Sequence, residues 1–553
     1  MGSQSVRPFF RLALFVTLGL TAISFWPQFT SGPSAYAELP WRMFEYFDLT
    51  GGLNDGADQT VVKPDEASDL QNVVFTVSGA IKRRSGFTQL NSTAVPTGGI
   101  MTGLAQYTQV DGTRFLVATV ANSGVITGSV YTMPYGGSTA GPTGTWTERT
   151  GSILVESTQN TLADYALAEG VIVLEDGDGT TPPATWNGSG DLSAIVGFGV
   201  VPNASMVEYH KNILWVAGDT AHPSLLSFSN IGDLTAWTET DFLNINTDDG
   251  QRIRAIKSAL DCLYVFKDAS IWRVCGSDRD NLIQEQMVQG YGTLSNQSVQ
   301  LIQNTFYFVT QRGEIAAYDG GIHVQVISQK VTGTLQSIDI SRLGQAVSTT
   351  FNDGSGADNY YIALSSSGSG TNDLLLQYHP FYKSWLKHRG MSTNALATFE
   401  IGSVQPAIMF GDYAGRANRY PNSNSDAGTA ITSFYQSAQF HYPELPQEKI
   451  FRLSRVFLNE GGTGTVTFET RVNFERVTTG SLSLGGGIGS LWDTALWDTA
   501  IYGDANAVIG RVEINQIGDF FQWKLSDASV TNPYTLRGVQ VWVEPTDRIG
   551  GIN

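Results

Sequence analysis

The residues best suited to chemistry are two aspartates in the repeated stretch LWDTALWDT. Asp493 and Asp498 each follow a tryptophan directly, Trp492 and Trp497. Paired carboxylates that flank a sugar bond are the arrangement that glycosidases use. Short adjacent repeats more often form tight turns in which aspartates accept backbone hydrogen bonds. We therefore expect a turn here, and the two tryptophans are candidate contacts for a protein partner.

Other catalytic patterns are missing from the sequence. No G-x-S-x-G, P-loop, H-E-x-x-H or dinucleotide-binding fingerprint is present. The string SNIGDLTAW has the tryptophan of a sialidase repeat, but not its aspartate and glycine in register. The histidines show no metal-ligand spacing; they are His210, His222, His323, His379, His388 and His441. The sequence thus predicts no catalytic, cofactor or metal site, and a protein that is not an enzyme.

The two cysteines, Cys262 and Cys275, lie in the hairpin sequence DCLYVFKDASIWRVCG. A two-residue loop at residues 268–269 would pair Lys267 with Ser270, and counting outward places one cysteine opposite the other. Such a non-hydrogen-bonded pair has its α-carbons close enough for a disulfide. Two small apolar residues facing each other in a core are the commoner outcome. The oxidation state stays open, and one bridge in so long a chain does not identify a secreted protein.

Composition favours an all-β protein. The chain has 553 residues, enough for two or three domains, with 60 glycines and only 15% charged residues. Its 41% hydrophobic content argues against a disordered chain. A net charge of −18 argues against a protein that grips nucleic acid by neutralising phosphates. The same charge permits a surface that DNA passes without binding.

The N-terminus has two interpretations. Arg7 and Arg11 precede the apolar run LALFVTLGLTAISFW, and residues 35–37 supply an A-x-A cleavage pattern, as in a signal peptide. The run is short for a bilayer, so no membrane span is predicted. Alternatively, Met43 is the true start and residues 1–42 are an upstream extension. Both interpretations exclude residues 1–42 from the fold.

One hairpin pattern recurs along the middle of the chain, at intervals typical of four-stranded propeller blades. The copies are TRFLVATVANSGVITGSVYTM, EGVIVLEDGDGTTPPATWNG, KNILWVAGDTAHPSLLSFSN, DCLYVFKDASIWRVCG, NTFYFVTQRGEIAAYDGG, NYYIALSSSGSGTNDLLLQYHP and PAIMFGDYAGRANRYPN. Another strand often precedes the hairpin, as in SMVEYH and SVQLIQ. We predict a β-propeller of six or seven blades over residues 96–428, with two stacked β-sandwich domains as the alternative.

The pattern changes near residue 430. FETRVNFERV, GDFFQWKLSD and LRGVQVWVEP are longer alternating strands, separated by a glycine-rich segment and by LWDTALWDT. They predict a separate β-sandwich-like or jelly-roll-like domain over residues 429–553.

A basic hairpin occupies the N-terminal part of the fold, within residues 43–95. In EASDLQNVVFTVSGAIKRRSGF, alternating apolar residues lead to a turn at residues 78–79 and a return strand from Ile81. Lys82, Arg83 and Arg84 follow. They could form a solvated edge that discourages aggregation, or a docking edge for an acidic partner.

This region resembles the N-terminal signature of the tail nozzle or tail hub proteins of short-tailed phages, also called tail tubular B-like or packaged-DNA stabilisation proteins. That signature contains a Gly-Gly-Leu-Asn turn, then Ala-x-x-Leu-x-Asn-Val, and then Gly-x-Ile-x-x-Arg with a following glycine. The matching positions are Gly51, Gly52, Leu53, Asn54, Ala67, Leu70, Asn72, Val73, Gly79, Ile81, Arg84 and Gly86. Two later segments are also similar to such proteins. One runs from SNIGDLTAW to IWRVCG, and the other is LWDTALWDT.

The resemblance implies a structural virion protein. Six copies would form a ring below the portal and adaptor, retain the packaged genome and open for ejection, with DNA passing through unbound. Needle, spike or fibre proteins would be further partners. Lys82, Arg83 and Arg84 would then dock on a neighbouring copy or on the adaptor. The signal-like leader departs from the family, and it keeps a secreted bacterial propeller for adhesion or carbohydrate binding as the alternative.

Overall fold

The computed structural model describes residues 41–91, 95, 99–122, 128–135, 145–149, 160–401, 404–442, 448–459, 464–484, 507–530 and 533–546. Residues 41–553 form one compact unit. Within the described ranges the regular secondary structure is almost entirely β-strand, as the composition predicts.

The middle of the chain is a β-propeller with seven four-stranded sheets among the described residues, which we call blades 1 to 7. Blades 1 to 3 contain β7 (Gly99–Thr108), β8 (Arg114–Asn122), β9 (Gly128–Tyr135), β10 (Thr147–Glu148), β11 (Asp164–Ala168), β12 (Val171–Glu175), β13 (Ala184–Trp186), β14 (Ser193–Ala194), β15 (Met206–His210), β16 (Ile213–Ala217), β17 (Leu225–Phe228) and β18 (Phe242–Asn244). Blades 4 and 5 contain β19 (Ile253–Ala259), β20 (Cys262–Lys267), β21 (Ser270–Cys275), β22 (Ile283–Gln289), β23 (Gln300–Ile302), β24 (Thr305–Val309), β25 (Ile315–Tyr318) and β26 (Val324–Val326). Blades 6 and 7 contain β27 (Val347–Phe351), β28 (Asn359–Leu364), β29 (Leu374–His379), β30 (Ser384–Arg389), β31 (Ala395–Ile401), β32 (Val404–Gly411), β33 (Ala417–Ser423) and β6 (Gly86–Gln89).

The seven recurring hairpins are the second and third strands of the seven blades. The first strand of each blade is the innermost, and β31 contacts β7 to close the ring. In blades 2 to 5, a two-residue loop with positive φ at both positions joins the first strand to the second. Three of these loops end in Asn or Asp, at Asn212, Asp261 and Asn304. These residues tolerate the left-handed conformation that a tight hairpin turn requires.

Blade 7 takes its outermost strand from the other end of the propeller sequence. Strand β6 pairs with β33, so residues 86–89 close the ring together with residues 395–423. The predicted propeller range of 96–428 missed this strand, because four residues carry no hairpin pattern of their own.

Hydrophobic clusters fill the spaces between neighbouring blades. One of them joins blades 3 and 4, for example, through Trp215, Phe228 and Leu263. The cluster between blades 5 and 6 differs, because it continues without a break into the core of the second β domain. Packing of this kind supplies most of the stability of a β fold.

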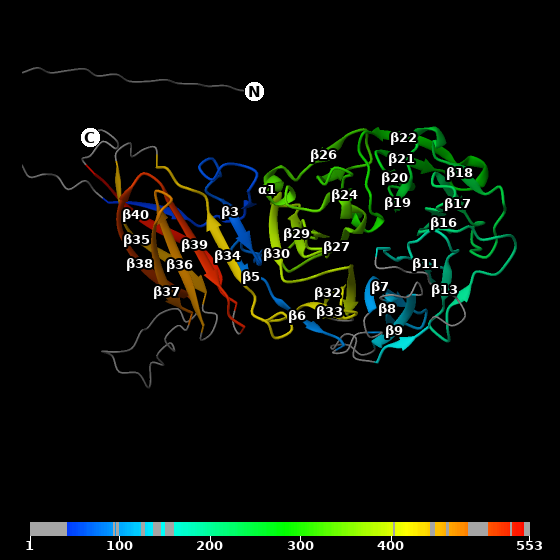
Figure 1. Cartoon of the computed structure of the whole chain (residues 1–553), viewed down its shortest axis with the longest axis horizontal. Helices are drawn as coiled ribbons and strands as arrows, with labels where there is room; N and C mark the ends of the chain where they lie inside the picture. Colours follow the sequence, from blue (N-terminus) through cyan, green and yellow to red (C-terminus); the bar gives the residue numbers. More distant parts are fainter. Residues whose placement is uncertain are drawn as a thin grey trace, which may run out of the picture. The chain divides into compact units, whose positions relative to one another are not determined.

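The second β domain is a sandwich of two six-stranded sheets. The first sheet contains β38 (Ala507–Gly518), β35 (Lys449–Asn459), β40 (Thr535–Pro545), β5 (Ile81–Arg83), β4 (Val73–Phe75) and β1 (Arg42–Tyr46). The second sheet contains β2 (Gly52–Leu53), β3 (Glu66–Gln71), β34 (Ser433–Ser437), β39 (Phe521–Asp527), β36 (Thr465–Val472) and β37 (Arg476–Ser483). Figure 1 shows blue N-terminal strands beside yellow and red C-terminal ones.

Two predicted boundaries are corrected by this topology. Residues 43–95 are not a separate docking segment, because β1 to β5 belong to the sandwich sheets. Residues 429–553 do not form the second domain alone, for the same reason. The fold also begins slightly before residue 43, since β1 starts at Arg42.

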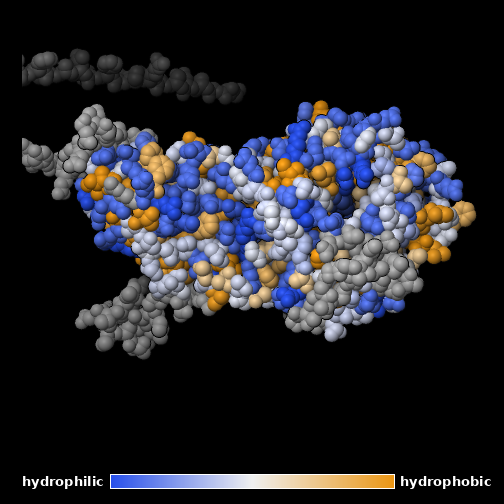
Figure 2. Space-filling view, in the orientation of Figure 1, coloured by the Kyte–Doolittle hydropathy of each residue, from blue (hydrophilic) through white to orange (hydrophobic). Residues whose placement is uncertain are grey.

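Helical segments are short in the described chain. They are α1 (Thr332–Leu335) and 3-10 helices at Thr247–Asp249, Arg279–Asn281, Asn296–Ser298, Gln329–Val331 and Ile340–Gln345. None of the described helices is long and apolar enough to cross a membrane. The face in Figure 2 is mainly hydrophilic, with small scattered hydrophobic patches.

Candidate functional site

Two consecutive arginines lie buried where the chain passes from the sandwich to the propeller. Arg83 ends β5 of the sandwich, and Arg84 lies just before β6 of blade 7. Their side chains have no exposed area and form ion pairs with Asp527 and Asp426. We call these four residues, together with Asn72, the junction clamp.

The guanidinium group of Arg84 uses all of its N–H groups. It forms a bidentate pair with Asp426, at 2.8 Å from Nη1 to Oδ1 and 2.6 Å from Nη2 to Oδ2. Its Nε donates to Asn72 Oδ1, and its remaining N–H groups donate to the carbonyls of Ser85 and Arg389. Because Asp426 lies on the segment that returns from the propeller, this pair joins the two chain crossings.

Arg83 links the same crossing to the sandwich. Its Nη1 donates to Asp527 Oδ2 at 2.8 Å and to the backbone carbonyl of Ser529. Its Nη2 donates to the carbonyl of Asn424, on the returning segment. Breaking a buried pair of this kind leaves an uncompensated charge in the interior, which is strongly destabilising.

The prediction that Arg83 and Arg84 project toward a partner is therefore wrong, because both are buried by partners within the same chain. The hairpin itself is confirmed, with Val73 opposite Arg83 and a turn at positive-φ Gly79. Lys82 is partly exposed and stays a candidate docking residue. Trp492 and Trp497, the other candidate contacts, lie outside the described residues.

Three residues that match the signature, Asn72, Arg84 and Gly86, lie at this junction. Asn72 has a φ of 55°, and its Oδ1 accepts hydrogen bonds from Arg84 Nε and from the backbone N–H of Arg389. Two glycines are required by close approach. A Cβ on Gly86 would lie 2.1 Å from the carbonyl oxygen of Ser425, and one on Gly52 would lie 2.6 Å from the carbonyl oxygen of Trp385. In this chain, Asn72, Gly52 and Gly86 therefore lie where the sandwich packs against the propeller.

A buried histidine lies beside the clamp. Burial, reinforced by the charge of Arg84, lowers the pKa of His388 to about 3. Its Nε2 lies 3.0 Å from Gln377 Oε1, and its ring stacks on Tyr361. A histidine with so low a pKa is neutral at physiological pH, so its role here is packing.

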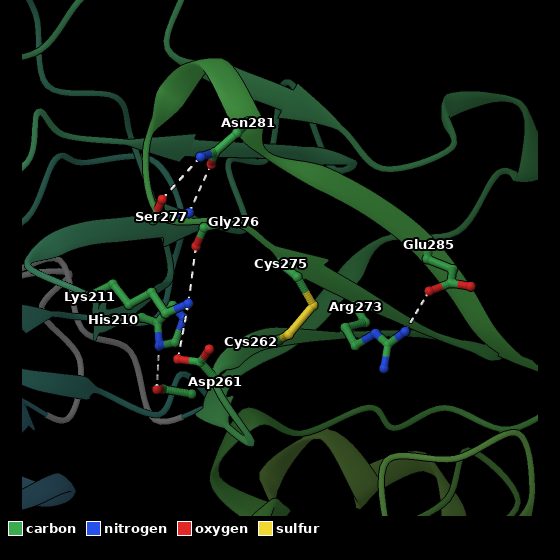
Figure 3. Close-up of a disulfide and its surroundings, with 11 residues drawn as sticks. His210, Lys211, Asp261, Cys262, Arg273, Cys275, Gly276, Ser277, Asn281 and Glu285 are labelled. Carbon is green, nitrogen blue, oxygen red and sulfur yellow. Dashed lines mark hydrogen bonds and ion pairs between the residues drawn. A yellow bond between two sulfur atoms is a disulfide. The ribbon is translucent and has the colours of Figure 1, made fainter.

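The two cysteines form a disulfide within blade 4 (Figure 3). Leu263 pairs with Val274, so Cys262 faces Cys275 with their α-carbons 4.6 Å apart. The predicted register and proximity are confirmed, whereas the commoner outcome of a reduced pair is not found. Lys211 of blade 3 contacts both ends of this hairpin, pairing with Asp261 at 3.0 Å and donating to the Gly276 carbonyl (Figure 3).

A polar pocket lies where the inner ends of blades 2 to 6 meet, and we call it the axial pocket. Its volume is about 290 Å³. The side chains that matter for its chemistry are Asp178, Asp219, Arg252, Asn296 and Gln345. Since the inner strands surround the propeller axis, lining by so many blades places the pocket on that axis.

Two glutamine side chains at the pocket connect segments of different blades. Gln297 Nε2 donates to the carbonyl of Ala163 at 2.9 Å and to Asp164 Oδ1 at 3.0 Å. Gln345 Nε2 donates to Asn160 Oδ1 at 3.1 Å. These bonds join the segments leading into blades 5 and 6 to the segment leading into blade 2, so they fix the pocket wall.

A buried carboxyl lies near this wall. Burial, followed by the charges of Asp176, Asp164 and Asp178, raises the pKa of Glu175 well above its usual value. Glu175 is not among the residues that line the axial pocket, so we assign it no reaction.

The described residues contain no group of three or more His, Cys, Asp or Glu side chains that could hold a metal ion. No pattern in the sequence predicts the axial pocket. The hairpin spacing locates the loops that carry Arg252 and Asn296, but nothing in that spacing shows that they converge.

No protein-family model and no curated protein matches the sequence. Solved structures are similar in fold. The exo-β-1,3-galactanase of Phanerochaete chrysosporium has a TM-score of 0.25 at 9% identity, covering 83% of this chain and 100% of that one. The N-terminal domain of Nup159 has a TM-score of 0.38 at 11% identity, covering 63% of this chain and 97% of that one. The WD40 domain of Neurospora crassa Pan2 has a TM-score of 0.25 at 8% identity, covering 61% and 97%.

Likeness at these identities concerns the fold alone, which is that of a β-propeller. Several of the similar structures are glycoside hydrolases. The prediction that the chain is not an enzyme is corrected by this finding, because the absence of familiar motifs does not exclude activity in such a fold. No particular activity follows for this chain.

Proposed function

We propose that the chain is a tail nozzle subunit of a short-tailed phage. In this role, six copies form a ring that extends the DNA channel below the portal and adaptor. The ring retains the packaged genome, opens for ejection and provides the attachment point for needle, spike or fibre proteins. The protein is then located in the tail of the virion, after assembly in the host cytoplasm.

The resemblance of residues 51–86 carries this proposal, and three of its twelve matching residues lie at the junction. All three, Asn72, Arg84 and Gly86, are buried; Arg84 bonds Asn72 and Asp426, and Gly86 lies too close to Ser425 for any side chain. The net charge of −18 supports the proposal further, because DNA slides past an acidic wall without forming salt-dependent contacts.

Electron microscopy of the purified chain, alone and with the portal and adaptor proteins, tests the proposal. We expect a sixfold ring with a central channel. Lys82→Glu should weaken ring assembly or attachment by placing like charges across an interface. Lys63→Glu, at another exposed lysine of the sandwich, is the matched control. A chain that stays monomeric with both partners present would rule the proposal out.

A secreted bacterial propeller, used for adhesion or carbohydrate binding, is the second candidate. The disulfide between Cys262 and Cys275 favours it, since stable disulfides form mainly in oxidising compartments. Intact-mass measurement of the protein from its native source distinguishes the two. Cleavage after Ala37 together with a monomer would favour the secreted protein, and a ring without cleavage would favour the tail.

A further inference from the structure

The first sheet of the sandwich exposes large apolar side chains on its outer face, which is formed by β1, β40, β35 and β38. When one face of an antiparallel sheet packs on the core, the other face is usually polar. Here the exposed apolar side chains are Trp41, Met43, Phe47 and Ile509, and each is between 45% and 59% exposed. We call this surface the outer sandwich face. Apolar side chains that gather on one exposed face often mark a protein–protein contact site.

The alternation of side chains along β1 shows which of them belong to this face. The ring of Tyr46 stacks on Phe440 within the hydrophobic core, with ring centroids 4.0 Å apart. Because successive side chains of a strand point to opposite faces, Met43, Glu45 and Phe47 point outward. Phe47 directly follows the last residue of β1 and continues this alternation.

One row across the outer sandwich face is apolar from end to end. Phe457 of β35 pairs with Ile509 of β38 on one side and with Gly538 of β40 on the other. A Cβ on Gly538 would lie 2.3 Å from the ring of Phe47, so the absence of a side chain there lets Phe47 lie across β40. Phe47 thereby contacts Phe457, with ring centroids 5.3 Å apart. The row therefore ends in Phe47 on one side of the sheet and in Ile509 on the other.

The next row is charged, with opposite signs at its two ends. Arg455 of β35 pairs with Arg511 of β38 on one side and with Gln540 of β40 on the other. Gln540 pairs in turn with Glu45 of β1 and donates a hydrogen bond to its carboxylate. Arg511 also forms an ion pair with Glu513 at 3.0 Å, but both side chains are more than half exposed. The row therefore runs from two adjacent cations to one anion.

Both rows are complementary to themselves under a twofold axis that lies parallel to the strands. Such an axis places β38 of one copy over β1 of the other and keeps each row opposite the same row. Ile509 then lies over the partner's Phe47, and Arg511 lies over the partner's Glu45. Each contact occurs twice, as in every isologous interface. Two sheets that pack face to face with nearly aligned strands are a common arrangement in β proteins.

We propose that the outer sandwich face binds a second copy of this chain, face to face about this axis. Burial of the apolar row favours association, and the charged row fixes the orientation. A twofold axis across the strands would instead place Arg511 over the partner's Arg511. The pairing does not rest on the tail role, because the subunits of a closed ring meet through head-to-tail contacts, whereas this contact is isologous.

Sedimentation velocity of the full chain over a range of concentrations tests the pairing. We expect a monomer–dimer equilibrium with a Kd on the order of 10 µM, since a flat face without a deep pocket gives weak affinity. Arg511→Glu should raise the Kd at least tenfold, because it places like charges opposite each other at two symmetric contacts. Glu45→Arg should have the same effect. The double variant Arg511→Glu, Glu45→Arg should restore the dimer, because the two charges have then changed places across the interface.

Glu285→Arg is the matched control, because Glu285 is also an exposed glutamate in an ion pair with an arginine, on the outer strand β22 of blade 4. It should leave the Kd unchanged. If Arg511→Glu fails to fold, Glu45→Arg serves in its place. The pairing is disproved if the chain stays monomeric at about tenfold the expected Kd, if both single variants dimerise like the wild type, or if the double variant does not restore the dimer. A sixfold ring that forms without this dimer would disprove the pairing and leave the tail role standing, and a dimer that never forms a ring would do the reverse.

Discussion

The propeller is built mostly from consecutive strands, whereas the sandwich combines strands from the two ends of the described chain. Each of blades 1 to 6 is built from one continuous stretch, so that strands next to each other in the sheet are also consecutive in the chain. The sandwich combines strands from residues 42–83 with strands from residues 433–545, so the entire propeller is inserted between its two parts. Blade 7 also combines distant segments, because its strand β6 comes from the chain before blade 1. Long-range pairing costs more loop-closure entropy than local pairing, and it must be fixed by specific contacts.

The junction clamp supplies such contacts, at the point where the propeller and the sandwich meet. The outgoing crossing near Arg84 and the returning crossing near Asp426 lie against each other, held by the bidentate pair. The disulfide, by contrast, joins two neighbouring strands of one blade. Removing the Arg84–Asp426 pair and removing the disulfide, in separate variants, therefore measures how much a long-range contact and a local contact each contribute to stability.

The largest effect should come from Arg84→Met. The substitution leaves the Asp426 carboxylate buried, 8% exposed, without its cation. We expect a loss of about 3–5 kcal/mol in the free energy of unfolding. Urea denaturation followed by tryptophan fluorescence measures it, with sandwich and propeller losing stability together.

Lys82→Met is the matched control for this substitution. Lys82 lies two positions before Arg84 but is partly exposed, so its loss should change stability by no more than about 0.5 kcal/mol. The double variant Arg84→Met, Asp426→Leu should recover part of the loss, because neither charge is then left alone. If Arg84→Met and Lys82→Met lowered the free energy of unfolding by the same amount, the clamp would not be what holds the junction.

A smaller and more local effect should follow from replacing both cysteines with serine. The disulfide closes a separation of 13 residues, for which chain entropy sets an upper limit of about 3 kcal/mol. The tight turn between β20 and β21 already restricts this loop, so the loss should fall below the limit. Hydrogen exchange should accelerate in β20 and β21 while β39 of the sandwich stays protected. Faster exchange in β39 would show that blade 4 is coupled to the sandwich.

The same contrast explains what could be predicted from the sequence. The seven hairpins and the Cys262–Cys275 register depend on nearby residues, and their alternation and turn residues predict them directly. Strand β6 pairs with residues more than three hundred positions away, and β5 pairs with residues of β40 more than four hundred positions away. No local pattern indicates that Leu536 lies opposite Ile81.

The candidate sites follow this rule as well. The three consecutive cations Lys82, Arg83 and Arg84 predict an exposed edge, because charged residues are rarely fully buried. Their buried partners, Asp426 and Asp527, stand in segments without any distinguishing pattern. The axial pocket depends on the convergence of five blades, which hairpin spacing does not describe. Gly52 and Gly86 indicate the contact between the domains better than the cations do, since a close approach of two backbones often requires glycine.

The smallest effect should come from a more exposed contact across the same junction. Lys330 of the propeller lies 3.0 Å from Glu66 of β3, and its side chain is 33% exposed. Lys330→Met should cost about 1 kcal/mol at neutral pH, because Glu66 is buried but keeps its hydrogen bonds from Asn54 and from the backbone N–H of Lys63. Lys63→Met, at an exposed lysine nearby without an ion pair to Glu66, is the control and should cost less.

The effect of Lys330→Met should also depend on pH. Burial raises the pKa of Glu66, but hydrogen bonds from Asn54, Lys330 and the backbone of Lys63 outweigh it, so the net pKa is lowered from 4.5. A group whose pKa is lower in the folded state contributes stability above its unfolded pKa, and loses it as pH falls through the folded value. The difference between wild type and Lys330→Met should therefore persist down to pH 4.5 and shrink below it. A difference that stayed constant in acid would mean that Lys330 acts through its contact with the Gly51 carbonyl instead of through Glu66.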